Sequence, residues 1–83
     1  MKFKAEIDVM PHAALLDPQG KAVTGSMTNI GLPQIQNVRI GKHITLAFES
    51  ETEAEAHVIV DTACKKLLAN LIMETYIFSI KII

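Results

Sequence analysis

Leu16-Asp17-Pro18-Gln19-Gly20-Lys21-Ala22-Val23 is the stretch that decides how this chain is organised, because it predicts where the first helix begins. The carboxylate of Asp17 can accept hydrogen bonds from the unpaired amides at a helix start. Pro18 suits the first helical position, where its missing N–H costs nothing and its φ is already helical. Gly20 lowers the helix propensity of the first turn, so we expect the backbone of another segment to approach it closely.

The composition is that of a small globular protein. The chain has 83 residues, of which 49% are hydrophobic and 20% are charged, and its formal net charge is −1. We therefore predict one domain over residues 1–83. The near-neutral charge indicates neither a nucleic acid nor a membrane as partner. A chain this short buries only about 60% of its unfolded surface, which favours self-association or docking on another protein.

No feature of the sequence indicates export or insertion into a membrane. The first six residues alternate between charged and apolar side chains after Met1, unlike a signal peptide. The most apolar run, residues 67–83, is interrupted by polar and charged residues. Because Cys64 is the single cysteine, it has no internal disulfide partner, and we expect a cytoplasmic protein.

Hydrophobic periodicity predicts the element order β-α-β-β-α-β. Residues 2–10 alternate apolar and charged side chains, as expected of a strand with one buried face. The first helix begins at the Asp17 cap and ends before Gly31, which is the usual residue after a helix end. A second helix is predicted over residues 51–69 and a last strand over residues 73–83.

Residues 34–49 are predicted to form a β-hairpin. A two-residue turn would place the apolar residues of the two strands on opposite faces, whereas a three-residue loop, Gly41-Lys42-His43, places them on one. The cross-strand pairs that follow are Ile40 with Ile44 and Val38 with Leu46. The predicted fold class is therefore α+β, a two-layer ferredoxin-like arrangement with a four-stranded antiparallel sheet and two helices on one face.

Two apolar residues fall on faces that are predicted to be polar. Val58 lies on the polar stripe of the second helix, and Ile77 lies opposite its apolar neighbours in the last strand. Single exposed apolar residues are common, so this pair is a weak indication of a protein contact. The inward positions predicted for the second helix are Ala56, Ile59, Val60, Ala63, Cys64 and Leu67.

The predicted topology supports many functions, so the residues must decide among them. An RNA-recognition domain needs aromatic side chains on the outer sheet face, and none is predicted there. The loop from Met10 to Ala14 has neither the Cys-x-x-Cys of a metal carrier nor the arginine of an acylphosphatase-like enzyme. The three histidines, at positions 12, 43 and 57, lack ligand-like spacing, and Cys64 falls on a buried stripe. We therefore expect no catalytic, cofactor-binding or metal-binding residues in this chain.

The basic tip of the predicted hairpin is the candidate for binding a partner. A guanidinium such as that of Arg39 can hold a carboxylate through two parallel hydrogen bonds. The alternative is an ordinary solvated turn. The predicted partner-interface residues are Arg39, Lys42, His43, Val58 and Ile77.

Three segments together point to one family: the opening stretch 16–23, then Asn37-Val38-Arg39-Ile40-Gly41-Lys42, then Cys64-Lys65-Lys66-Leu67-Leu68-Ala69-Asn70. In order and separation they resemble the PurS family, the small subunit of phosphoribosylformylglycinamidine synthase, over nearly the whole chain. The sequence departs from the family pattern in two places. Leu71 stands where the family usually has proline, and Pro11-His12-Ala13-Ala14 replaces its usual Lys-x-Gly approach to the first helix.

The resemblance implies a role in purine biosynthesis. The family's complex converts formylglycinamide ribonucleotide (FGAR), ATP and glutamine into formylglycinamidine ribonucleotide (FGAM), glutamate, ADP and phosphate. It implies a glutaminase subunit that releases ammonia and a large synthetase subunit that uses ATP and magnesium. The small subunit, a homodimer or higher oligomer, would bridge the two and help to transfer ammonia. The alternatives are a small-molecule-sensing domain and a purely structural dimerisation domain of the same topology.

Overall fold

The computed structural model describes residues 1–15 and 17–83, and in these residues it has an α+β architecture. Its three strands form one antiparallel sheet in the order β2-β1-β3. The elements in chain order are β1 (Lys2–Pro11), α1 (Pro18–Asn29), β2 (Lys42–Glu49), α2 (Glu53–Ala63), the π-helical turn η1 (Cys64–Leu68) and β3 (Glu74–Ile82).

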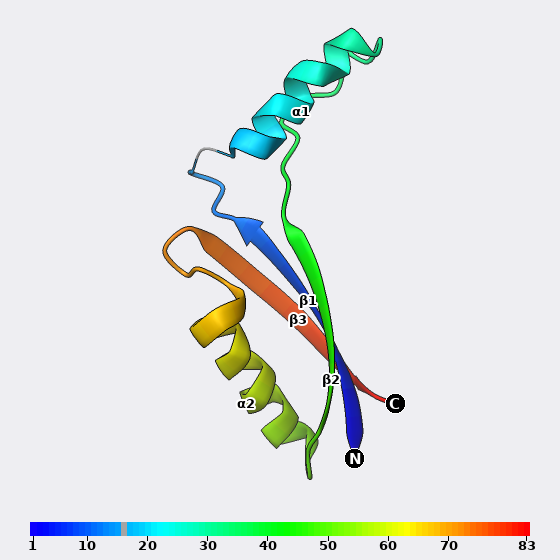
Figure 1. Cartoon of the computed structure of the whole chain (residues 1–83), viewed down its shortest axis with the longest axis vertical. Helices are drawn as coiled ribbons and strands as arrows, with labels where there is room; N and C mark the ends of the chain where they lie inside the picture. Colours follow the sequence, from blue (N-terminus) through cyan, green and yellow to red (C-terminus); the bar gives the residue numbers. More distant parts are fainter. Residues whose placement is uncertain (16) are drawn as a thin grey trace.

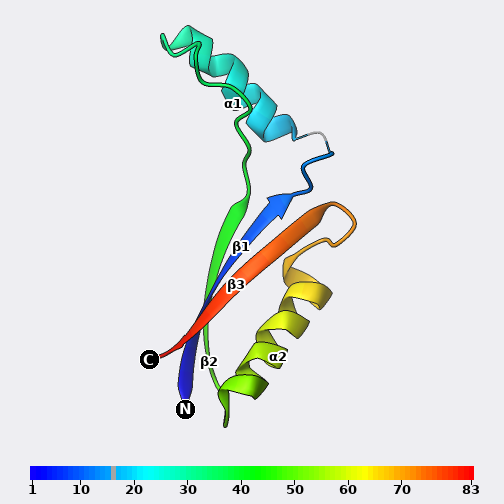
Figure 2. The same cartoon turned by 180° about the vertical axis from the view of Figure 1, so that it is seen from behind.

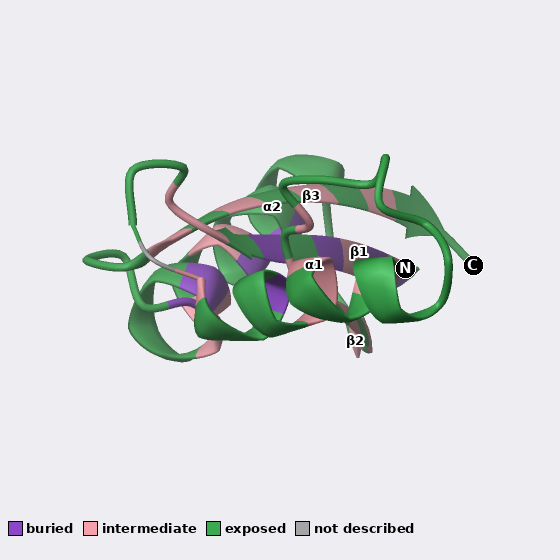
Figure 3. Cartoon of the chain, turned by 90° about the horizontal axis from the view of Figure 1, so that it is seen from above, coloured by how far each residue is buried: buried purple, intermediate pink, exposed green. Residues whose placement is uncertain are grey.

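The core lies between the central strand β1 and helix α2. Alternate residues of β1, Phe3, Ala5, Ile7 and Val9, are fully buried, as predicted from the alternation of apolar and charged residues. Helix α2 contributes buried residues at its inward positions, and Figure 3 shows the buried residues on these two elements. Two apolar faces thus meet and exclude water, which is the main source of stability in a domain of this size.

Helix α1 does not cover the sheet. It lies beyond the end of the sheet together with the segment that returns from it to β2 (Figures 1 and 2). We call residues 17–41 the arm. The prediction of two helices on one face was therefore wrong, since α2 alone covers the sheet. The radius of gyration is 16.5 Å, whereas a compact chain of this length has about 12 Å.

The predicted hairpin over residues 34–49 was also wrong. Residues 34–41 form no strand, and the sheet has three strands among the described residues instead of four. The segment runs directly into β2 without reversing (Figure 1). Its amides bond to α1 instead: Val38 N–H donates to Thr24 Oγ1 at 3.0 Å, and Ile40 N–H donates to the Asp17 carboxylate at 2.9 Å. Ile44 accordingly pairs with Ile7 of β1.

Helix α1 begins as predicted. Asp17 is its N-cap and accepts a hydrogen bond from Gly20 N–H at 3.0 Å, and Pro18 occupies the first helical position. After the helix, Gly31 has a φ of +84°, a left-handed conformation that favours glycine. Leu16, the first residue of the stretch that predicts this helix start, lies outside the described residues.

The π-helical turn changes which residues face the core at the end of α2. In an α-helix the inward positions after Cys64 would be Leu67 and Leu68. The wider turn is closed by a hydrogen bond from Ala69 N–H to the Cys64 carbonyl oxygen at 3.0 Å, five residues apart. It moves the inward position to Leu68 and Ala69, so that Leu67 is exposed. Ile59 is likewise exposed, so both were predicted wrongly as inward residues.

The close approach predicted at Gly20 is confirmed, and it makes a paired test possible. A Cβ at Gly20 would lie 2.2 Å from the Val38 carbonyl oxygen, whereas a Cβ at Gly25 in the same helix would meet nothing within 4 Å. Gly20→Ala should lower the free energy of unfolding by about 1–3 kcal/mol, because the returning segment must move. Gly25→Ala should raise it by about 0.5–1 kcal/mol through helix propensity alone.

Chemical denaturation of the two variants beside the unmodified chain measures both effects. A stabilised Gly20→Ala variant would show that no backbone lies against this glycine.

Candidate partner interface

The carboxylate of Asp17 joins the two halves of the arm. One oxygen accepts from Gly20 N–H at the start of α1 at 3.0 Å, and the other accepts from Ile40 N–H in the returning segment at 2.9 Å. These two hydrogen bonds are the main cause of a lowered pKa of Asp17, and the nearby Arg39 guanidinium adds to it. A residue predicted only as a helix cap therefore also determines where the chain re-enters the sheet.

Arg39 fastens the base of the arm to the end of β1. Its Nη2 donates to the carbonyl oxygens of Pro11 and His12, the latter at 3.1 Å. The side chain is exposed, and a guanidinium has five N–H donors, so these bonds leave others free to reach a partner. That Arg39 binds a partner's carboxylate remains a prediction.

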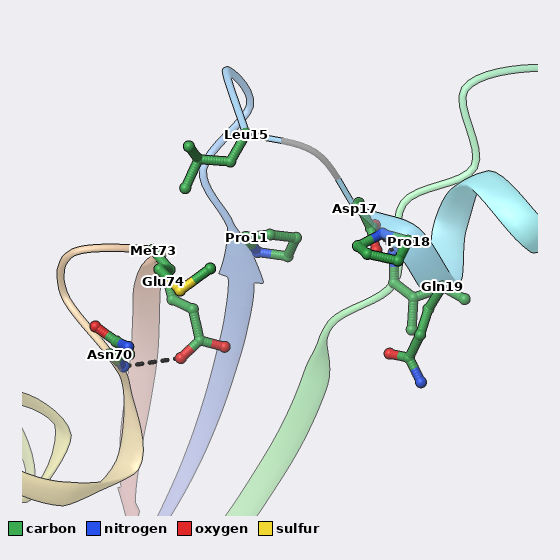
Figure 4. Close-up of a pocket in the computed structure, with 9 residues that line it drawn as sticks. Pro11, Leu15, Asp17, Pro18, Gln19, Asn70, Met73 and Glu74 are labelled. Atoms are coloured by element: carbon green, nitrogen blue, oxygen red, sulfur yellow. Dashed lines mark hydrogen bonds between the residues drawn. The ribbon is translucent and has the colours of Figure 1, made fainter.

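A cleft of about 350 Å³ lies between this base and the loop that precedes β3. Figure 4 shows its polar side chains, among them Asp17 and Glu74, on opposite sides of the opening. Both carboxylates already accept backbone hydrogen bonds, since Glu74 Oε1 accepts from Asn70 N–H at 2.8 Å. Both carboxylates of the cleft are therefore already used by hydrogen bonds within the chain. The residues that line it are Pro11, Leu15, Asp17, Pro18, Gln19, Ile40, Asn70, Met73 and Glu74.

The five predicted interface residues do not form one surface. His43 and Ile77 are both paired with Asp8 in register, so they lie in one row on the sheet face opposite α2. His43 Nδ1 lies 2.6 Å from the Asp8 carboxylate. Lys42 pairs with the buried Val9 and so belongs to the other face, and Val58 is exposed on α2. Arg39 lies at the base of the arm.

A polar network between α2 and β3 was not predicted. Tyr76 donates to Asp61 Oδ1 at 2.5 Å, and Lys65 Nζ lies 2.9 Å from the other oxygen of Asp61. These contacts lower the pKa of Asp61, and the hydrogen bond to Asp61 raises the pKa of Tyr76 to about 12. Burial raises the pKa of the nearby Cys64 thiol, which keeps it protonated and unreactive. The spacing of these residues in the sequence does not predict that an aspartate of the helix contacts a tyrosine of the strand.

The two places where the sequence departs from the family pattern contact each other. His12 Nε2 lies 3.2 Å from the Leu71 carbonyl oxygen, and His12 N–H donates to the Met73 carbonyl oxygen at 2.9 Å. The loop after β1 and the turn before β3 are thus held together across the end of the sheet.

The described part of the chain has neither a cluster of metal-binding side chains nor a helix that could cross a membrane. Residues 1–15 and 17–83 hold no group of three or more His, Cys, Asp or Glu side chains placed to bind a metal ion. None of their helices has the length and apolar character needed to cross a membrane.

Replacing Asp17 by asparagine tests the joint between the halves of the arm. An amide offers one acceptor oxygen in place of two and carries no charge, so the bridge cannot be kept whole. Asp17→Asn should speed hydrogen exchange at the amides of Gly20 and Ile40 at neutral pH. Asp8→Asn, on the outer sheet face, is the matched control and should leave both amides unchanged.

Acid should weaken the same two hydrogen bonds in the unmodified chain, so the protection of these amides, which is their exchange rate relative to that of an unfolded chain at the same pH, should fall. Because its pKa is lowered from the usual value of 3.8, Asp17 releases its proton more readily in the folded than in the unfolded chain. Its contribution to stability is complete above about pH 4 and is lost as the pH falls through the lowered pKa. Protection of the Ile40 amide that changes neither in the Asp17→Asn variant nor in acid would contradict the bridge.

The chain is similar to known proteins over almost its full length. Residues 4–82 match the family model described as "PurS: Phosphoribosylformylglycinamidine (FGAM) synthase". The PurS subunit of this synthase from Synechocystis sp. is 40% identical over 78 residues, which are 94% of this chain and 78% of that protein. The Bacillus subtilis PurS subunit is 34% identical over 79 residues, covering 95% of this chain and 93% of that protein.

Solved structures of PurS proteins are also similar to this chain. The B. subtilis PurS structure has a TM-score of 0.85 at 32% identity and covers 96% of this chain and 99% of that chain. A chain of the structure described as PurLQS from Thermotoga maritima has a TM-score of 0.88 at 34% identity, covering 98% and 99%. The extended arm is therefore part of a shared shape. The chain belongs to the PurS family of phosphoribosylformylglycinamidine synthase subunits.

Proposed function

We propose that this chain is the small subunit that bridges the glutaminase and synthetase subunits of the FGAM synthase complex. The observation that carries the proposal is the arm. A compact subunit would bury its first helix on its own sheet, whereas here α1 extends past the sheet and its described residues other than Gly20 are at least partly exposed (Figure 1). Such surface is stabilised by contact with other proteins. The T. maritima structure is named PurLQS, and this name places PurS together with two further subunits.

A second copy of the chain is the first of these partners. The part of the sheet formed by β2 is only half covered, because Ile44, Leu46 and Phe48 point toward the α2 side and remain partly exposed. Val23 and Met27 form an apolar stripe on the arm, and this stripe does not pack on the sheet of the same chain. We propose that the arm of one copy packs against another copy, giving a homodimer or a higher oligomer.

The chemistry explains why a synthase needs a subunit with such a surface. Ammonia released by a glutaminase into neutral water is largely protonated, and ammonium is not a nucleophile. A closed path between the two active sites keeps the reactive form away from water. We assign ATP and magnesium to the synthetase subunit and no cofactor to this chain, and we place the complex in the cytoplasm, where the free, buried Cys64 stays reduced.

Reconstitution tests the bridging role. The two larger subunits from the same organism should form FGAM from glutamine only when this chain is added. High concentrations of ammonium chloride should restore FGAM formation without it, because external ammonia bypasses the transfer. Rates are measured with and without this chain for each nitrogen source.

Glutamine-dependent activity that is equal with and without the chain would contradict the proposal. A thermal shift of the isolated chain with one metabolite, and no effect on the synthase, would favour the small-molecule-sensing alternative. Self-association without any effect on the synthase would favour the purely structural dimerisation domain.

Arg39→Ala should weaken assembly of the complex while leaving the sheet intact. The substitution releases the carbonyl oxygens of Pro11 and His12, so the base of the arm becomes mobile, and it removes a donor for a partner's carboxylate. Arg39→Lys keeps the charge and should rescue assembly partly. Sizing chromatography with the larger subunits measures the effect, and unchanged assembly in both variants would remove Arg39 from the interface.

A further inference from the structure

The sheet face opposite α2, which we call the outer face, carries an ordered pattern of charge. Helix α2 lies on the other side of the sheet, and α1 extends past its end (Figures 1 and 2). Antiparallel sheets often leave one face in water, and the side chains of such a face are normally polar. Ile77 is an exception, because it lies in register with Asp8 on this face and is 71% exposed.

The register of the three strands arranges the side chains of the outer face in four rows. Read from β2 through β1 to β3, the rows are Glu49-Lys2, Ala47-Lys4-Lys81, Thr45-Glu6-Ser79 and His43-Asp8-Ile77. The charges of the first row balance. The second row carries two positive charges, and the third and fourth rows carry one carboxylate each. Positive and negative charges are therefore separated along the strands.

The two lysines of the second row are not neutralised by a direct contact. Lys4 and Lys81 lie directly opposite each other on neighbouring strands, where like charges destabilise a sheet. The two ion pairs found among the described residues include neither of these lysines, and they do not include Glu6. A carboxylate from another molecule would relieve the repulsion between the lysines.

The order of the rows is complementary to itself when it is reversed. A two-fold axis can lie in the plane of the outer face, across the strands and between the rows of Lys4 and Glu6. The second copy generated by this axis places its Glu6 over Lys4 and its Asp8 over Lys2. No like charges then lie directly opposite each other. A second copy with its rows in the same order would instead place lysines against lysines, which is unfavourable.

The same arrangement brings the apolar residues of the face together. Ile83 donates its N–H to the Lys2 carbonyl oxygen and so extends the first row, and it is 61% exposed. The two-fold axis places it over Ile77 of the other copy. The central positions of the face hold short side chains, which let two sheets approach to the usual distance of about 10 Å. These side chains are Thr45, Ala47 and Ser79.

The size of the outer face limits how strongly two copies can bind through it. Three strands about 4.8 Å apart, each presenting about eight residues that rise about 3.3 Å apiece, give a face of roughly 300–400 Å². A stable interface buries about 800 Å² on each partner. A contact through the outer face is therefore weak by itself and sensitive to salt.

We propose that the outer faces of two copies of this chain pack against each other about this two-fold axis, with Lys4 of each copy paired to Glu6 of the other. The contact is separate from the packing of the arm proposed above, since it uses the opposite face of the sheet. It joins copies without help from the larger subunits.

Reversal of charge tests this pairing between chains. Lys4→Glu and Glu6→Lys each bring like charges together across the axis, so either variant alone should lose the contact. In a mixture of the two variants, each glutamate again meets a lysine of the other chain. The swapped chain, Lys4→Glu with Glu6→Lys, restores the opposite charges within one variant. The matched control is Lys66→Glu, because Lys66 is exposed in η1 on the other side of the sheet.

Sedimentation equilibrium at low and high salt measures the mass of each chain, and circular dichroism verifies its fold. At low salt we expect the unmodified chain, the swapped chain and the control to associate equally. Each single variant should associate about tenfold or more weakly, and the equimolar mixture should regain the association. High salt should reduce the mass of the unmodified chain to that of the single variants. If Glu6→Lys does not fold, the comparison of Lys4→Glu with the swapped chain still decides.

Two results would overturn the proposal. One is a mass that is the same for Lys4→Glu as for the unmodified chain, which would mean that the outer faces do not meet. The other is a loss of association in Lys4→Glu that neither the swapped chain nor the mixture restores, which would mean that Lys4 does not pair with Glu6 of a second copy. Weaker binding of Lys4→Glu to a larger subunit, with its own mass unchanged, would assign the outer face to that subunit and also overturn the proposal.

Discussion

The bridge from the Asp17 carboxylate to the amides of Gly20 and Ile40 is the interaction on which the rest of the structure depends. One oxygen caps the first turn of α1. The other accepts a hydrogen bond from the Ile40 amide, which could otherwise pair with a neighbouring strand. With Thr24 taking the amide of Val38 in the same way, the returning segment belongs to α1 and not to the sheet. The bare backbone of Gly20 lets the Val38 carbonyl oxygen come close enough for both bonds to form. Because of these contacts α1 is held away from the sheet, and the chain presents an arm.

Much of the fold could be predicted from local patterns. The alternation in β1 and the cap of α1 are local signals, and the structure confirms both. The alternation of residues 38–40 with 44–46 also fits a hairpin, and there the prediction failed. Side-chain acceptors on α1 satisfy those amides, and periodicity carries no information about such long-range bonds. Gly41 shows the same limit: it resembles a turn residue, yet it lies where a Cβ would be 2.2 Å from the Val9 carbonyl oxygen.

The candidate interface was less predictable than the fold. Val58 and Ile77 were recognised as exposed because they break a pattern, and both are exposed. Leu67 could not be recognised in this way, since it fits the apolar stripe of an ideal α-helix. The π-helical turn changes its direction, and a π-helical turn has no simple sequence signature. The arm and the turn 67–73 then present apolar surface from one end of the sheet, which is consistent with a subunit that acts by contact.

The most direct test of this account is the set of contacts that residues 38–40 make in solution. Nuclear Overhauser effects in the isotopically labelled chain measure them. The account predicts cross-peaks between Val38 and Thr24, and none between Val38 and Leu46 or between Ile40 and Ile44. Cross-strand peaks for these two pairs, with none to Thr24, would mean that the segment forms a hairpin with β2, and would contradict the arm.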